Sequence, residues 1–321
     1  MHDQGGNWST WPPAQPPRSI LAPDSPEQPN SPAKLAGVLG VVIALVLAVA
    51  LLGRDDVFDG VTEIAGVPIA APGAPNAAPG STTPSTGAMP RAVYRLGDNP
   101  LLAEGIAMPQ VTCELPAMKS DAEQLRAYYQ AAIGCLDQAW RPVLASVNEP
   151  FTPPRLEIEA ARSMCGEAPS ADEATAYYCS GGKVIFMPVD RLLDQAGLSQ
   201  AAHLTVLAHE YGHHVQALSG ILTAAYDKGE PFDKKSPERL ELTRRAELQA
   251  NCFAGLFIAS VAGRGSVGTK LARAAADSFR DTIADDAHGT IKHQVAWGRA
   301  GYDSGRTAAC NTWNAPAEEV S

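Results

Sequence analysis

The sequence feature that most constrains this chain is His-Glu-Tyr-Gly-His at residues 209 to 213. On an α-helix, residues four apart lie about one turn apart on nearly the same face, so His209 and His213 can direct both imidazoles at one ion. Glu210 lies beside that pair and can reach a water molecule on the ion. Zinc prefers tetrahedral nitrogen and oxygen ligands and lowers the pKa of a bound water. The motif therefore predicts a zinc site with Glu210 as general base.

The residues around the motif favour a helix from residue 200 to residue 218, with Ser199 as its N-cap and Gly220 at its end. One apolar face follows helical spacing, through Leu204, Leu207, Tyr211, Val215 and Leu218. Gly212 costs about 1 kcal/mol relative to alanine inside a helix. Its presence makes sense if something must approach the backbone closely. The alternative is a helix with two incidental surface histidines.

A third protein ligand is expected on the next helix, which the sequence predicts from residue 236 to about residue 262. Glu247 lies in the apolar part of that helix, where a carboxylate must be paired or bind a metal. Glu241 lies among arginines, as on a solvated ion-pair surface. We therefore expect Glu247 to be the third ligand. The alternative is a buried salt bridge from Glu247 to Arg244 or Arg245.

Other local patterns predict the elements around this site. A capping box at residues 120 to 123 begins a helix that Pro142 is expected to stop. Residues 176–179 and 183–187 flank Ser-Gly-Gly and predict a β-hairpin. A strand at residues 183–187, beside the metal helix, could also bind an extended peptide by strand addition. A polar loop is expected from residue 223 to residue 235.

Three segments precede the predicted folded domain, which covers residues 94–316. Residues 1–34 contain eight prolines and predict a disordered Pro-rich tail. Residues 35–53 are uncharged and long enough to cross the ~30 Å hydrocarbon core of a bilayer as one helix. We expect a single transmembrane anchor there, with a buried soluble helix as the alternative. Residues 54–93 are rich in Ala, Pro, Gly, Ser and Thr and predict a linker.

Cysteine and charge distributions indicate the compartment and exclude one class of partner. All six cysteines follow the predicted anchor, which indicates disulfides and an oxidising environment. The sequence does not choose among their possible pairings, but we favour Cys113–Cys135, Cys165–Cys179 and Cys252–Cys310. A second zinc site is the alternative, although no Cys-x-x-Cys is present. The positive-inside tendency weakly favours a cytoplasmic amino terminus and an extracytoplasmic domain. The net charge of -10 argues against nucleic acid as a partner.

Two longer motifs resemble a known family. They are His-Glu-Tyr-Gly-His-His-Val-Gln at residues 209–216 and Glu-Leu-Gln-Ala-Asn-Cys-Phe-Ala-Gly at residues 247–255. With closing motifs at His288-Gly289-Thr290 and around residues 296–312, they resemble the bacterial neutral zinc metallopeptidases over roughly residues 94–314. The resemblance implies an α+β, zincin-like domain, mainly helical with a small sheet. It also implies zinc held by His209, His213 and Glu247, with Glu210 as catalytic base.

Three further residues are candidates for supporting roles. Asn251 stands where the family usually has Asp, and it could orient a ligand histidine through its carbonyl without adding negative charge. His288 could stabilise the charge that develops on a substrate carbonyl, or it could make a structural hydrogen bond at a helix start. Tyr302 has the same two interpretations. His214 is about 100° from His213 around the helix, so we expect a capping or surface role.

These observations predict a membrane-anchored, extracytoplasmic zinc peptidase that acts on peptide or protein substrates. Two other functions stay open. One is a non-catalytic or weakly active zinc-binding module that binds a partner at the cell surface, which Asn251 favours. The other is a zinc hydrolase that acts on cell-wall cross-bridges or another amide. Nothing in the sequence selects a particular substrate side chain.

Overall fold

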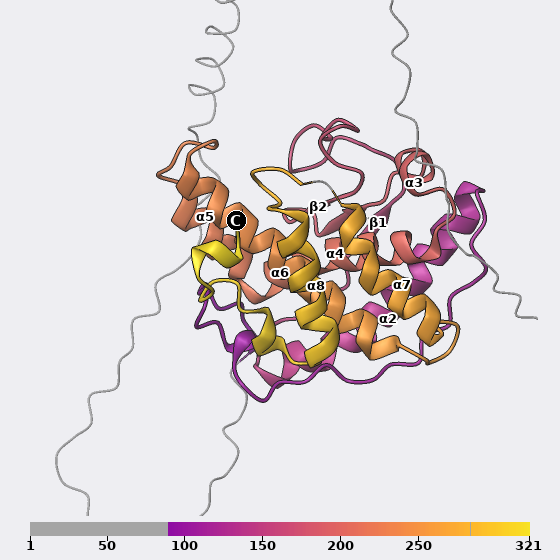
Figure 1. Cartoon of the computed structure of the whole chain (residues 1–321), viewed down its shortest axis with the longest axis horizontal. Coiled ribbons are helices and arrows are strands. Elements are labelled where there is room, and N and C mark those ends of the chain that lie inside the picture. The colour runs from indigo at the N-terminus through magenta and orange to yellow at the C-terminus, as the bar shows by residue number, and fades with distance from the viewer. Residues whose placement is uncertain (1–88, 283) are drawn as a thin grey trace, which may run out of the picture. The chain divides into compact units, whose positions relative to one another are not determined.

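A computed structural model describes residues 89–282 and 284–321. The predicted tail, the predicted anchor and most of the predicted linker lie outside these residues. Within the described residues, no helix is both long enough and apolar enough to cross a membrane. This part of the chain is mainly helical with a small sheet, as the sequence predicts (Figure 1).

Two long helices carry the motif residues. Helix α4, Gln200–Ser219, begins at Ser199, whose side chain accepts a backbone hydrogen bond, and it ends at Gly220 with a left-handed φ of 84°. Helix α6, Pro237–Val261, begins at Ser236 with proline in its first turn. The ends of both helices therefore agree with the sequence prediction to within a residue or two.

Helices α4 and α6 pack against each other at Gly212. A Cβ atom at Gly212 would lie 2.9 Å from both Cα and the carbonyl oxygen of Ala250 in α6. Only glycine therefore allows this approach, which explains a residue that costs about 1 kcal/mol inside a helix. The contact brings the histidines of α4 next to Glu247, which precedes Ala250 by less than one turn.

Other helices complete the core around this pair. Helix α8, Ile291–Ser304, packs along α6, and α2, Ala122–Ser146, and α7, Thr269–Asp277, pack against α4 (Figure 1). The apolar stripe of α2 is buried, through Leu125, Tyr129, Ala132, Leu136 and Trp140. The predicted end of this helix at Pro142 is wrong, because α2 continues to Ser146.

Two short helices lie on either side of α4 along the chain. Helix α3 is Val189–Ala196, and α5 is Ile221–Gly229. The predicted polar loop from residue 223 is therefore helical over much of its length. Helix α5 follows α4 directly because Gly220 serves as the end of one helix and the start of the next.

A three-stranded sheet with the order β1-β3-β2 packs against α4. Strands β2, Tyr177–Cys179, and β3, Val184–Phe186, form the predicted hairpin, and β1, Arg155–Glu157, pairs in parallel with β3. Strand β3 is therefore paired on both sides. The expectation that residues 183–187 could accept a peptide strand is wrong, because the edge strand of this hairpin is β2.

Three disulfides cross-link the described residues, and they are the pairs that we favoured from the sequence. Cys113–Cys135 joins the segment before α2 to that helix, and Cys165–Cys179 joins a long loop to β2. Cys252–Cys310 joins α6 to a short 3-10 helix at Thr307–Cys310. No free cysteine is left over in the described residues.

Candidate metal centre

Three potential ligand atoms converge where α4 faces α6. Nε2 of His209 and Nε2 of His213 lie 3.2 Å and 3.3 Å from Oε2 of Glu247, and the two Nε2 atoms lie 3.2 Å apart. A tetrahedral ion with bonds of ~2.0–2.1 Å holds its ligand atoms roughly 3.3 Å from one another. The spacing of the three atoms therefore fits one zinc ion. In the part of the chain that the structure describes, these residues form the one group with metal-binding geometry.

Glu247 faces the histidines rather than an arginine. Arg245 instead pairs with Glu241, with 2.7 Å between Nη2 and Oε1. Arg244 donates its hydrogen bonds to backbone carbonyl groups. The alternative of a salt bridge from Glu247 to either arginine is therefore wrong within the described residues.

The electrostatics of the three groups favour a cation between them. Burial would raise the pKa of Glu247, but the charges and hydrogen bonds of His213 and His209 hold that pKa well below its usual range. Burial would lower the pKa of His213, but Glu247 outweighs it and raises that pKa to about 9. The site thus stabilises positive charge at the point where the three ligand atoms meet, which is the property that a divalent metal requires.

Asn251 lies behind His209, one turn after Glu247 on α6. Its Oδ1 is 2.8 Å from Nδ1 of His209. Asn251 accepts a hydrogen bond from Nδ1–H of His209, so the proton stays on Nδ1 and the lone pair of Nε2 is free for a metal. The structure therefore brings Asn251 to the position that its spacing predicts.

Gln216 occupies the equivalent position behind His213, and the sequence analysis gave it no role of its own. Its Oε1 lies 2.9 Å from Nδ1 of His213. The two residues are three apart on α4, a spacing at which helical side chains meet. That spacing is the signal that could have identified Gln216.

Glu210 lies at the boundary of two cavities. Its side chain is only 6% exposed, and it lines both a cavity of about 250 Å³ and a cavity of about 410 Å³. Burial raises the pKa of Glu210, although the charges of His209 and His213 oppose that shift. A raised pKa lies closer to neutral pH, where a carboxyl group can both accept and return a proton.

Both cavities are bordered by the segment that leads into β2. Ala174 and Ala176 line both, and Tyr177 and Tyr178 line the smaller one. Arg191 of α3 holds this segment, because its Nη1 donates to the carbonyl of Ala174 over 2.7 Å. The edge strand of the sheet therefore lies alongside the proposed metal site.

His288 reaches the site from the loop before α8, whereas Tyr302 does not line either cavity. Nε2 of His288 lies 4.0 Å from Oε2 of Glu247, and its Nδ1 lies 2.8 Å from Oδ1 of Asp285. His288 lines both cavities. Tyr302 lies on α8, and Cζ of Arg299 is 5.7 Å from the centroid of the Tyr302 ring.

His214 points away from the three ligand atoms, but its predicted surface position is wrong. The side chain is fully buried. Its Nε2 donates to the carbonyl of Thr152 over 2.7 Å, and its Nδ1 accepts from the hydroxyl of Tyr178 over 2.9 Å. Burial lowers the pKa of His214 to about 4, so the ring is neutral. It links α4 to β2 and to the loop before β1.

Comparison with known proteins agrees with this geometry. Residues 104–313 match the family model described as "Putative neutral zinc metallopeptidase". The uncharacterized protein Mb2605 of Mycobacterium bovis is 28% identical over 209 residues, which cover 56% of this chain and 68% of that protein. The uncharacterized protein YpfJ of Escherichia coli K12 is 24% identical over 216 residues, which cover 61% and 74%. No solved structure matches the chain. The chain belongs to the neutral zinc metallopeptidase family.

Proposed function

We propose that this protein is a zinc-dependent peptidase that hydrolyses peptide bonds. The observation that carries the proposal is the triangle of ligand atoms on His209, His213 and Glu247, with sides of 3.2–3.3 Å, beside the buried carboxyl of Glu210. Zinc, when bound, supplies a Lewis acid that polarises a carbonyl group and lowers the pKa of water. The residues around it supply the proton transfers and the binding of the substrate.

In this mechanism Glu210 takes the proton of the attacking water and passes it to the leaving amine. Its buried carboxyl lines both cavities, which supports this role. His288 is oriented by Asp285, and in its protonated form it donates Nε2–H toward the carbonyl oxygen that gains negative charge.

The substrate is proposed to be an extended peptide. The edge strand β2 borders the smaller cavity, and the segment before it borders both, so a peptide chain that lies along them can reach both cavities. An edge strand offers unpaired backbone groups for such a chain, and the cavities receive its side chains.

The test is a pair of substitutions at the motif. Glu210→Gln is expected to keep one zinc per chain but to lose about 10²–10⁴-fold in hydrolysis of a quenched peptide library, since the amide cannot accept a proton. His213→Ala is expected to lose both zinc and activity. Metal analysis and peptide cleavage, with and without a chelator, measure the two effects. Cleavage by Glu210→Gln at the wild-type rate would show that the mechanism is wrong.

A second candidate function is a zinc-binding module with little or no activity. The neutral acceptor Asn251 favours it, because His209 is then a weaker donor to the metal than it would be beside a carboxylate. Wild-type protein that binds zinc but cleaves no member of the library would support this function over the first.

A further inference from the structure

We propose that Gln216 and Gln249 form a relay of amide groups that holds His213 in its metal-binding tautomer, and that the Cys252–Cys310 disulfide fixes the far end of this relay. The inference rests on the proposed metal site. Oε1 of Gln216 lies 2.9 Å from Nδ1 of His213, and Nε2 of Gln216 lies 3.0 Å from Oε1 of Gln249. Nε2 of Gln249 in turn lies 3.0 Å from the carbonyl oxygen of Cys310.

Backbone carbonyl groups fix the direction of every hydrogen bond in the relay. Nε2 of Gln216 also lies 2.8 Å from the carbonyl oxygen of Ala246, which can only accept. The amide nitrogen of Gln216 must therefore face Ala246, and its oxygen must face His213. Nδ1 of His213 then carries the proton, and Nε2 keeps the lone pair that a metal requires.

The same logic applies one step further along the relay. The carbonyl of Cys310 requires the amide nitrogen of Gln249, so the oxygen of Gln249 is left to accept from Gln216. Both glutamine side chains are fully buried, so water cannot replace either partner. The tautomer of His213 is thus set by a chain of neutral groups, which ends at the carbonyl of Cys310, three hydrogen bonds from the ring.

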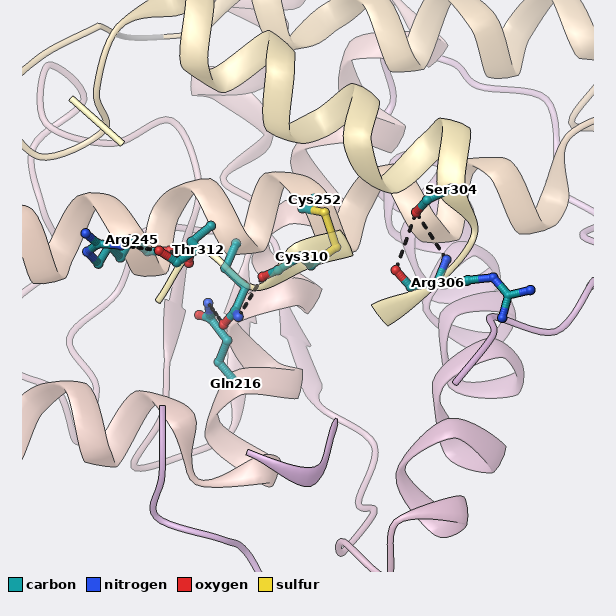
Figure 2. The surroundings of a disulfide bond; sticks show 8 residues. Gln216, Arg245, Cys252, Ser304, Arg306, Cys310 and Thr312 are labelled. Atoms are coloured by element: carbon teal, nitrogen blue, oxygen red, sulfur yellow. Dashed lines mark hydrogen bonds between the residues drawn. A yellow bond between two sulfur atoms is a disulfide. The ribbon is translucent and has the colours of Figure 1, made fainter. Parts of the chain in front are cut away.

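The disulfide determines where the last acceptor lies. Cys310 belongs to the short helix Thr307–Cys310 and is bonded to Cys252, which follows Gln249 by three residues on α6. Thr312 adds a second tie to α6, since its hydroxyl donates to the carbonyl of Arg245 over 2.7 Å. Figure 2 shows Gln216 directed toward the segment that carries Cys310 and the disulfide. The cross-link therefore holds the Cys310 carbonyl in reach of the relay.

The first experiment measures zinc affinity of the full-length protein in detergent by competition with a chromophoric chelator. Gln216→Leu and Gln249→Leu are each expected to weaken zinc binding by about 10–100-fold, the usual effect of losing a group that orients a ligand. The double variant should bind zinc only slightly more weakly than the weaker of the two single variants, because both changes break the same relay. Ser260→Ala removes another buried hydrogen bond of α6, far along the helix, and should bind zinc as wild type does.

A second variant keeps the test decisive if Gln216→Leu does not fold. Gln216→Glu retains an acceptor for His213 but cannot donate to Ala246 as a carboxylate, so it should destabilise the protein while zinc affinity stays at or above the wild-type value. Histidine side-chain ¹⁵N NMR of the zinc-loaded protein reports the tautomer directly, and His213 of the wild type should then carry its proton on Nδ1. Zinc affinity of Gln216→Leu within about twofold of wild type, or a proton on Nε2, would overturn the relay. Wild-type protein that binds no zinc would instead overturn the proposed function.

The role of the Cys252–Cys310 disulfide can be tested against a second disulfide of the same domain. Replacing Cys252 and Cys310 together by alanine is expected to weaken zinc binding by about 10-fold or more, because the Cys310 carbonyl is released. Replacing Cys113 and Cys135 removes a disulfide that does not contact the relay, so stability should fall while zinc affinity of the folded protein stays at the wild-type value. Equal zinc affinities in the two double variants would show that the Cys252–Cys310 disulfide does not hold the relay in place.

Discussion

Both histidines of the proposed metal site are held by neutral amide oxygens, from Asn251 behind His209 and from Gln216 behind His213. Such an acceptor fixes the orientation and tautomer of an imidazole, but it adds no negative charge and does not strengthen the ring as a donor. Glu247 is then the single anionic ligand. We expect that geometry, more than charge, sets the zinc affinity of this site.

A substitution at Asn251 tests the effect of that missing charge. Asn251→Asp keeps an acceptor for Nδ1 of His209 and adds a negative charge, so zinc affinity should rise by about 10-fold. Asn251→Ala removes the acceptor, and affinity should fall by about 10–100-fold. Chelator competition at pH 7 measures both changes. Identical affinities in all three proteins would mean that Asn251 does not orient the ligand.

Glu149 is a second residue whose ionisation can be tested, and it lies outside the sequence motifs. Its side chain is 2% exposed, and within the described residues neither carboxylate oxygen has a hydrogen-bond partner. Burial raises the pKa of Glu149 to about 8. An unfolded glutamate has a pKa of about 4.3, so the folded state holds the proton more tightly. Stability should therefore fall as the pH rises from about 4 to about 8.

Glu149→Gln removes the ionisable group and should flatten that pH dependence. At pH 5 the variant and the wild type should differ little in melting temperature, whereas at pH 8 the variant should melt several degrees higher. Thermal unfolding with a chelator present isolates the effect from metal binding. A melting-temperature difference that is the same at both pH values would contradict the assignment.

At the scale of elements, the contact between α4 and α6 depends on Gly212. Gly212→Ala places a Cβ against the backbone of Ala250 and should destabilise the protein by about 1–3 kcal/mol, with weaker zinc binding because the two ligand-bearing helices separate. Gly134→Ala in α2 is the matched control. A Cβ there has no neighbour within 4 Å, so the substitution should stabilise the helix by up to about 1 kcal/mol. Denaturant unfolding and chelator competition measure both variants.

The sequence predicted the two long helices well, because their caps and apolar spacing are local signals at Ser199, Gly220 and Ser236. It also selected Glu247, since a carboxylate among apolar residues needs a partner. Local signals failed at Pro142, where packing of the buried α2 stripe outweighs one missing backbone donor. They also failed to show that residues 183–187 are paired on both sides, because the pairing of β1 beside β3 depends on contacts between distant segments.

At the scale of the whole molecule, the proposed location depends on residues 35–53, which lie outside the described residues. Their uncharged composition and the three disulfides of the domain support a membrane-anchored protein with its domain in an oxidising compartment. Protease added to intact cells should then remove the domain, while a cytoplasmic marker stays whole. Deleting residues 35–53 should move the protein from the membrane fraction to the soluble fraction. Full protection of the domain in intact cells would place it inside.

The burial of Cys252 and Cys310 has a consequence for how the protein matures. Both sulfur-bearing residues are completely enclosed, whereas the side chains of His209, His213 and Glu247 remain 13–18% exposed. An oxidant can reach those thiols only before the interior closes, but an ion can still enter afterwards. We therefore expect the cross-link to form first and metal loading to come last, so that cells starved of zinc would accumulate an oxidised, folded and idle precursor.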